Sequence, residues 1–130
     1  MLILLEKILK DFLMHSEKIS TVKAPEHWEC KQPNQIARDN ALKIYNFIFK
    51  THCLLPSVIA ATIEEGIYFR YISLDKTTSL IIEILNDGFI VWLTNDDINK
   101  TIKSSGEFED LNKLTEIIGA FNENKTCTKI

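Results

Sequence analysis

The sequence predicts an α+β fold in which a four-stranded antiparallel meander packs against two or three helices. Three observations support this prediction: extended, Ile-rich runs fill about residues 57–95, turn signals separate these runs, and amphipathic patterns lie on either side of them. The turn signals include Glu65-Gly66 and Asp87-Gly88. An acidic residue or Asn followed by Gly favours a hairpin, because glycine readily adopts the positive φ that tight turns need.

The length and composition indicate a single domain of ordinary size. A chain of 130 residues can bury a core large enough to fold without a disulfide or a metal. The formal charge of −3 disfavours nucleic acid as a partner, because nucleic-acid binders usually carry a basic face. Three cysteines without a CxxC pair fit a reducing cytoplasm. No segment approaches the ~20 apolar residues of a membrane span, so we expect a cytoplasmic protein with no membrane partner.

Residues 2–18 have the periodicity of an amphipathic helix. Its apolar side consists of Leu2, Leu5, Leu9, Phe12 and Leu13, whereas Lys, Glu and Asp residues cover the other side. A helix that lies on a membrane surface usually carries an excess of Lys or Arg on its polar side. Acidic and basic residues balance here, so we expect this helix to dock on the protein's own core.

Residues 19–34 lack periodicity and are expected to form a loop. Within it, Trp28 is expected to plug the edge of the core with its indole N–H at the rim. The alternative is that Trp28 anchors a partner. A second helix is expected at about 34–52, with Pro33 near its start and Pro56 beyond its end. Its apolar stripe consists of Ala37, Ala41, Ile44, Tyr45 and Ile48.

The meander at 57–95 begins with a hairpin whose register depends on its turn. If residues 64–66 form a three-residue loop with Gly66 left-handed, Ala61 faces Phe69. This register gathers apolar side chains on one face. Three residues of the third strand join that face: Leu80, Ile82 and Ile84. The opposite face holds Tyr68, Arg70, Ile72, Ile81, Glu83 and Leu85. Arg70 and Glu83 are then diagonal neighbours, which predicts an ion pair worth ~0.2–1 kcal/mol.

The turn that contains Gly88 has two alternative lengths. A two-residue loop turns Val91 and Leu93 toward the core face. A three-residue loop turns Ile90 and Trp92 toward that face instead, and analogy with the first turn favours this form. With either loop the second face of the sheet keeps much apolar character, so something must cover part of it: a helix or a second copy of the protein.

The segment after the meander is expected to end in a third helix. Residues 101–103 are a candidate for a short fifth strand. The S-x-x-E pattern at 104–107 is typical of a capping box, which predicts a helix at about 107–121. Its buried stripe consists of Phe108, Leu111, Leu114, Ile118 and Phe121. The polar tail at 122–130 is expected to fray.

No motif in the chain assigns a catalytic residue, a metal or a cofactor. His27, Cys30, His52 and Cys53 lack the paired spacing of zinc sites. A Cys–His nucleophilic pair also needs a third orienting group, which the neighbouring residues do not supply. Paired carboxylates occur at turns and helix starts, where acidic side chains are typically structural. The sequence therefore leaves open whether the protein is an enzyme.

The function that the sequence favours is a non-enzymatic protein-interaction module, acting as a homodimer or with a partner protein. A half-apolar sheet face with a central Arg has the composition of an interface centre. The candidate interface residues are Trp28, Tyr68, Arg70, Glu83 and Trp92. The alternative is a small-ligand binder or an enzyme with a pocket between helix and sheet near Trp28 and Arg70.

Several short motifs follow one another over about residues 25–95. They are Trp28-Glu29, Ala37 and Ala41, Pro56, Glu65-Gly66-Ile67, Ile82-Glu83-Ile84 and Asp87-Gly88. Their order resembles that of a loosely defined group of small, uncharacterised bacterial proteins. The chain departs from the group where His27 and Cys30 replace glycines beside the Trp-acid pair, and where Arg70-Tyr71 replaces an acid-Trp pair. The resemblance implies a similar fold and no particular activity.

Overall fold

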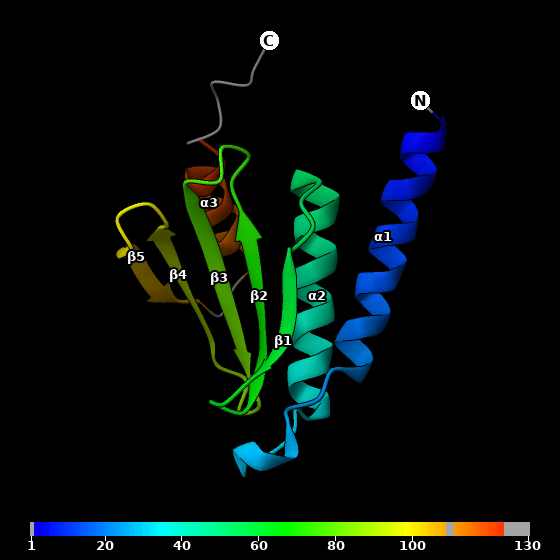
Figure 1. Ribbon diagram of the computed structural model, residues 1–130, viewed down its shortest axis with the longest axis vertical. Helices are drawn as coiled ribbons and strands as arrows, with labels where there is room; N and C mark the ends of the chain where they lie inside the picture. The colour runs from blue at the N-terminus through cyan, green and yellow to red at the C-terminus, as the bar shows by residue number, and fades with distance from the viewer. Residues whose placement is uncertain (1, 109–110, 124–130) are drawn as a thin grey trace.

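The computed structural model describes residues 2–108 and 111–123, in which helices pack against a run of strands (Figure 1). The helices are α1 (Leu2–Thr21), the 3-10 helix η1 (Glu26–Trp28), α2 (Gln35–His52) and α3 (Leu111–Glu123). The strands are β1 (Val58–Thr62), β2 (Gly66–Ile72), β3 (Thr78–Leu85), β4 (Ile90–Asp96) and β5 (Thr101–Glu107). The predicted α+β class is confirmed. The tail predicted to fray at 122–130 lies outside the described residues beyond Glu123, where α3 ends.

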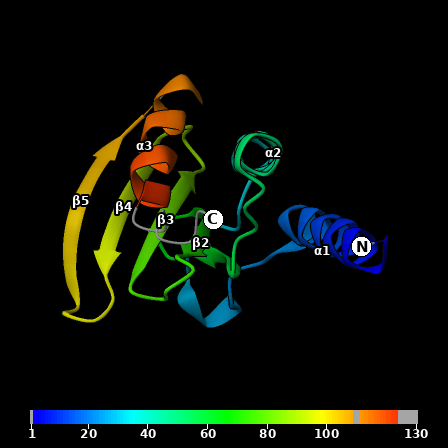
Figure 2. The ribbon, with the colours of Figure 1, turned by 90° about the horizontal axis from the view of Figure 1, so that it is seen from above.

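The five strands form one antiparallel sheet in the order β1-β2-β3-β4-β5, so each strand pairs with its neighbour in the sequence. α2 and α3 lie against one face of this sheet, and α1 lies beside α2 on the β1 side (Figure 2). The other face of the sheet is not covered by any α-helix of the described part of the chain. The predicted meander is therefore confirmed, and its two faces have different surroundings.

The core lies between the sheet and the helices α2 and α3. Its buried side chains come from alternate strand positions and from one stripe of each helix. The buried side chains include Ile67, Phe69, Tyr71, Leu80, Ile82 and Ile84 from the strands, and Ala37, Ala41, Ile44, Tyr45, Ile48, Leu114 and Ile118 from the helices. The apolar stripe predicted for the second helix and the core face predicted for the third strand are confirmed.

α2 begins at a side-chain cap one residue after Pro33. The Asn34 side chain accepts a hydrogen bond from the Ala37 N–H at 2.9 Å, which pairs one of the free amides of the first turn. Asn86, in the β3–β4 turn, holds the cap in place. The Asn34 N–H donates to Asn86 Oδ1 at 2.9 Å, and Asn34 Nδ2 donates to the Asn86 carbonyl at 3.0 Å. These bonds fix the start of α2 to one end of the sheet.

The β1–β2 register differs from the predicted one by two residues. Ala61 pairs with Ile67, not with Phe69, because the loop consists of residues 63–65. Strand side chains alternate with a period of two, so a shift of two residues leaves every side chain on its predicted face. The predicted register is wrong, but the predicted division into two faces is correct.

Gly66 is needed for packing and not for the turn. Glu65 takes the positive φ of 68°, and Gly66 is already the first residue of β2. A Cβ on Gly66 would lie 2.2 Å from the carbonyl oxygen of Ile84 on β3. The prediction that Gly66 is left-handed is therefore wrong: this position needs a glycine because two strands approach closely there.

The β3–β4 turn has three residues, 86–88. Ile82 pairs with Trp92, and the Leu85 N–H donates to the Phe89 carbonyl at 2.9 Å. Gly88 has a φ of 95° and so provides the left-handed residue of the turn. The favoured three-residue form is confirmed, and Trp92 consequently faces the helices.

β5 is longer than the fifth strand predicted at 101–103, because it includes the residues predicted to cap a helix. Gly106 pairs with Trp92, and Ser104 pairs with Thr94. The hydroxyl groups of Ser104 and Thr94 lie 2.6 Å apart and share a hydrogen bond. The prediction of a capping box at 104–107 is therefore wrong. The backbone of β4 offers these residues a full ladder of hydrogen bonds, and α3 begins only at Leu111.

α1 extends three residues beyond its predicted end, but only part of its apolar side reaches the core. Ile19 is fully buried, and the Phe12 ring centroid lies 4.4 Å from that of Phe49 and 5.1 Å from that of Tyr45. Three residues of the same side are exposed: Leu5 (54%), Leu9 (48%) and Leu13 (65%). The prediction of a core-docking helix is wrong for these residues, because α1 diverges from α2 toward its N-terminal end (Figure 1).

Two buried tyrosines differ in how their hydroxyl groups are satisfied. Tyr45 donates to the Phe12 carbonyl at 2.7 Å, whereas the buried hydroxyl of Tyr71 has no hydrogen-bond partner among the described residues. A buried unpaired polar group costs ~1–3 kcal/mol. Tyr71→Phe is therefore expected to raise the free energy of unfolding by ~1–2 kcal/mol, measured by urea denaturation. Tyr45→Phe is the control and is expected to lower it by ~1 kcal/mol. Equal losses in both variants would contradict this account.

Candidate functional site

The sheet face opposite α2 and α3 is the candidate functional surface, and we call it the open face. Its centre consists of nine outward-pointing side chains of β1–β4: Val58, Ala60, Tyr68, Arg70, Ile81, Glu83, Leu85, Val91 and Leu93. Thr62, Ile72, Ser79 and Asn95 continue this face at the ends of the strands. All nine are partly buried, although no α-helix of the described residues covers them. An antiparallel sheet that faces water usually shows polar side chains on its wet side. The apolar character of this face therefore makes it the candidate surface of the described residues.

The strand register arranges the centre of the open face in two rows. Arg70, Ile81 and Leu93 form one row, and Tyr68, Glu83 and Val91 form the next. Each row thus contains one charged residue and apolar residues on the adjacent strands. Because the cation lies on β2 and the carboxylate on β3, Arg70 and Glu83 are diagonal neighbours, as the sequence predicts.

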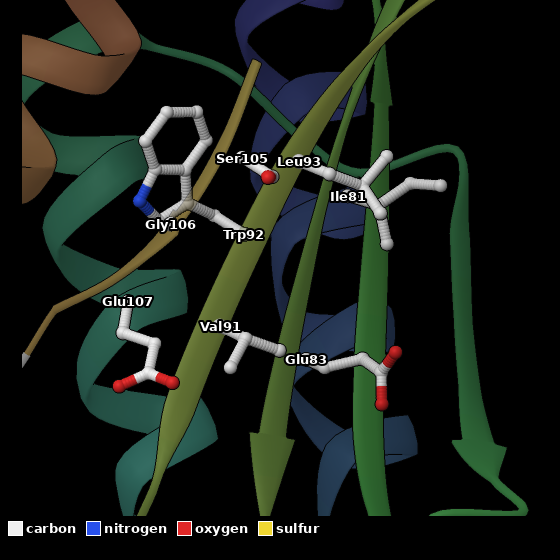
Figure 3. Close-up of a pocket in the computed structure, with 8 residues that line it drawn as sticks. All are labelled: Ile81, Glu83, Val91, Trp92, Leu93, Ser105, Gly106 and Glu107. Carbon is white, nitrogen blue, oxygen red and sulfur yellow. The ribbon is translucent and has the colours of Figure 1, made fainter. Parts of the chain in front are cut away.

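A shallow depression of about 310 Å³ lies where the open face meets β5 (Figure 3). Ile81 and Leu93 form its apolar part. Val91 lies between the side chains of Glu83 and Glu107, since the register pairs it with one on each side. This end of the open face therefore presents an apolar strip with a carboxylate on each side of it.

Arg70 forms an ion pair with Asp97 and not with Glu83. Its Nη2 atom lies 3.5 Å from Asp97 Oδ1, and the Ser79 hydroxyl donates to the same carboxylate oxygen at 3.0 Å. The predicted Arg70–Glu83 ion pair is wrong, because the Asp97 carboxylate, directly after β4, lies next to the guanidinium. Both partners are partly exposed, so this pair contributes little to stability, within ~0–1 kcal/mol.

Glu83 is a partly buried carboxylate in an apolar setting. Burial raises its pKa, the nearby charge of Glu64 raises it further, and a hydrogen bond from the Thr62 hydroxyl at 3.3 Å opposes these effects. A carboxyl group whose pKa rises on folding favours its protonated form in the folded state. The negative charge of Glu83 therefore destabilises the isolated chain at neutral pH.

Glu83→Gln is expected to raise the free energy of unfolding of the monomer at pH 7. The sign follows from the raised pKa: the cost of the carboxylate is absent below the unfolded-state pKa and is complete above the folded-state pKa. The gain in the free energy of unfolding should therefore disappear as the pH falls below about 4. Urea denaturation of both proteins at a series of pH values, at concentrations where both are monomeric, measures the difference. A gain that is independent of pH would contradict the assignment to the charge.

The two charged groups of the open face have partners within the chain, although the buried Nε of Arg70 has none among the described residues. Asp97 neutralises Arg70, and Thr62 donates to Glu83. The open face therefore provides apolar area and placed charges, which suit docking to another surface.

The two tryptophans predicted as interface residues lie in different places. Trp28 is half-buried in η1, which lies on the side of the sheet away from α2 and α3 (Figure 2). Trp28 does not pack against the core cluster, so the prediction that it plugs the core is wrong. Trp92 packs against the core cluster on the helix side of β4, so the prediction that it joins Tyr68 and Arg70 is wrong too. The three-residue turn at 86–88 is the cause.

A pocket between helix and sheet exists, but not near Trp28 and Arg70 where the sequence placed it. It has a volume of about 270 Å³ and lies between α3 and the outer strands. Its lining residues are Thr78, Trp92, Thr94, Lys103, Ser104, Ile117, Ala120 and Phe121. Sequence reasoning missed this pocket because the strand pattern of residues 104–107 was hidden by their resemblance to a helix cap.

The histidines and cysteines considered as zinc ligands lie far apart. His27 and Cys30 lie in and just after η1, whereas His52 and Cys53 lie at the end of α2, at the opposite end of the molecule (Figure 1). Within residues 2–108 and 111–123 no three His, Cys, Asp or Glu side chains gather in a way that could hold a metal. None of the described helices is long and apolar enough to cross a membrane.

Comparison with known proteins adds no relative to this description. The chain matches no protein-family model, no curated protein and no solved structure. The resemblance to a group of small bacterial α+β proteins therefore stays a prediction, and the function has to be inferred from the chain's own surfaces.

Proposed function

We propose that the protein is a non-enzymatic interaction module that forms a homodimer through the open face. The observation that carries the proposal is the one-sided sheet: α2 and α3 cover one face, while apolar side chains of four strands stand on the other with no α-helix of the described residues over them. Removing apolar surface from water contributes roughly 25 cal/mol per Å². Two such faces packed together would gain this term from both copies.

The charges of the open face favour a second copy as the occupant. A two-fold interface brings the same patch of each subunit together, so the patch has to complement itself. Arg70 and Glu83 lie in adjacent rows on adjacent strands. A copy turned end for end would present its own Glu83 near Arg70 and its own Arg70 near Glu83. The carboxylate that destabilises the monomer would then face a cation in the dimer.

Trp28 extends the proposed interface at one end. Its 3-10 helix lies on the same side of the sheet as the open face (Figure 2). Two backbone-to-side-chain bonds link the residues after it to the sheet: Lys31 N–H donates to Glu65 Oε2 at 2.9 Å, and Asn86 Nδ2 donates to the Gln32 carbonyl at 3.0 Å. A half-buried Trp on an anchored loop is the kind of residue that dominates binding energy in interfaces.

Light scattering after size-exclusion chromatography tests the proposal. The purified chain is expected to show twice the 15.0 kDa mass of one copy at high concentration and to dissociate on dilution. Binding free energies of about −8 to about −12 kcal/mol correspond to dissociation constants of about 1 μM to about 1 nM, so the series should run from about 100 μM to about 1 nM. A mass of one chain at every concentration would contradict the proposed homodimer. The open face could then only bind a different partner.

A further inference from the structure

The pocket between α3 and the outer strands has the chemistry of a small-ligand site, and we propose that it binds a small organic carboxylate with a flat apolar body. The pocket lies on the helix side of the sheet, and Trp92 separates it from the depression of the open face, because this residue lines both. Its volume of about 270 Å³ exceeds the roughly 150 Å³ of an apolar cavity that holds benzene. There is therefore room for one ring and a polar group.

Apolar side chains form one wall and the base of the pocket. Ile117 and Phe121 of α3 are 7% and 2% exposed, so they hold a fixed apolar wall. Trp92 of β4 lies opposite them and packs against the core cluster. Its indole can lie flat across β5 because it pairs with Gly106, where a Cβ would approach the indole Nε1 to 3.0 Å. A flat ring fits between an aromatic surface and an aliphatic wall.

The polar groups that line the pocket are mainly hydrogen-bond donors. Thr78 is 6% exposed, and its buried hydroxyl has no partner among the described residues. Thr94 and Ser104 share one hydrogen bond at 2.6 Å, so whichever hydroxyl accepts it still has its own hydrogen to donate. Lys103 adds an exposed ammonium group at the solvent side. An unpaired buried hydroxyl costs free energy that a ligand acceptor would recover.

This combination of donors selects an anion with several acceptor atoms. A carboxylate has two oxygens and about four acceptor positions, which suit two hydroxyl donors and an ammonium group. The charge of Lys103 also acts on Asp96, whose pKa is lowered mainly by hydrogen bonds from Asn99. Asp96 is thus satisfied by its own turn and leaves the Lys103 ammonium able to contact a ligand.

The test uses benzoate as the probe and Trp92 as the reporter. The chain has two tryptophans, so Trp28→Phe leaves Trp92 as its only indole. Benzoate is expected to shift the nuclear magnetic resonance signal of the Trp92 indole N–H in a saturable manner, with a dissociation constant of about 1 mM. This constant corresponds to a binding free energy of about −4 kcal/mol, which is typical of a ligand this small. Benzamide, which keeps the ring without the charge, and acetate, which keeps the charge without the ring, should each bind at least about tenfold more weakly.

Two variants separate the proposed site from non-specific binding. Lys103→Gln should weaken benzoate about tenfold and leave benzamide unchanged, because it removes only the charge. Thr78→Val keeps the shape and should weaken both probes, and Lys103→Gln, at an exposed position, keeps the test valid if Thr78→Val fails to fold. Ile81→Ser, on the open face, should change neither. The absence of a saturable shift, or a shift that Lys103→Gln leaves unaltered, would overturn the proposal.

Discussion

Gly66→Ala is expected to abolish the cooperative fold. A Cβ at this position would lie 2.2 Å from the Ile84 carbonyl oxygen and 2.8 Å from the Leu85 Cα. Both atoms belong to the backbone of β3, so no side-chain rotation can relieve the clash. Overpacking against side chains already costs ~1–3 kcal/mol, and moving a paired strand costs more. A domain stable by ~5–15 kcal/mol is expected to lose most of that stability, because β2 and β3 carry the centre of the core.

Gly119→Ala is the matched control for this prediction. Gly119 lies within α3, and nothing lies within 4 Å of the position that its Cβ would occupy. Alanine in a helix interior is more favourable than glycine by about 1 kcal/mol. Thermal and urea unfolding followed by circular dichroism should therefore show a Gly66→Ala protein that is unfolded or has lost most of its free energy of unfolding. The Gly119→Ala protein should be slightly more stable than the wild type. A Gly66→Ala protein as stable as the wild type would show that β2 and β3 can separate without cost.

Gly66 also shows how a correct prediction can follow from a wrong reason. The acidic-Gly pair predicts a hairpin at this place, and a hairpin is present, but Glu65 supplies the left-handed residue. The sequence cannot distinguish a glycine that makes a turn from one that permits close strand approach, because the difference lies in the neighbouring strand. At Gly88 the same signal gives the correct conformation, since the φ there is 95°.

The faces of the sheet were predictable because they depend only on alternation. Ile82 and Ile84 reach the core and Ile81 and Glu83 the open face, even though the β1–β2 register shifts by two residues. A three-residue turn that moves by one residue along the chain changes the register by two, and a pattern with a period of two survives that change. The diagonal relation of Arg70 and Glu83 was predictable for the same reason. The ion partner of Arg70 was not, because Asp97 reaches it from beyond the next strand.

The elements that were predicted wrongly are those whose environment depends on residues far away in the sequence. The side of α1 with Leu5, Leu9 and Leu13 is apolar, but the pattern does not say whether another element lies opposite it. Residues 104–107 satisfy the rule for a helix cap, yet β4 offers them strand pairing instead. Tertiary context therefore decided both cases, and with them the position of the α3 pocket.

Leu93→Glu is expected to convert the proposed dimer into a monomer. Leu93 lies in the row of Arg70 and Ile81, on the strand of the open face next to β5, and pairs with Ser105 on its other side. In a dimer the new carboxylate would be buried among apolar side chains, and the Arg70 guanidinium already has two carboxylates, Asp97 and, in the proposed dimer, the Glu83 of the other copy. A buried charge without a partner costs ~3–5 kcal/mol, which raises the dissociation constant by more than about 100-fold. The monomer should remain folded, because Leu93 is only partly buried in it.

The same substitution on α1 decides which apolar surface forms the dimer. Leu13 is 65% exposed, and Leu13→Glu places an equal charge on the other unpartnered apolar surface of the described chain. If the open face is the interface, light scattering across dilution should give a monomer for Leu93→Glu and a wild-type dimer for Leu13→Glu, with unchanged far-ultraviolet circular dichroism in both. The reverse result would move the interface to α1, and two undisturbed dimers would exclude both surfaces. Because the two variants add the same side chain, a difference between them can only come from where each leucine lies.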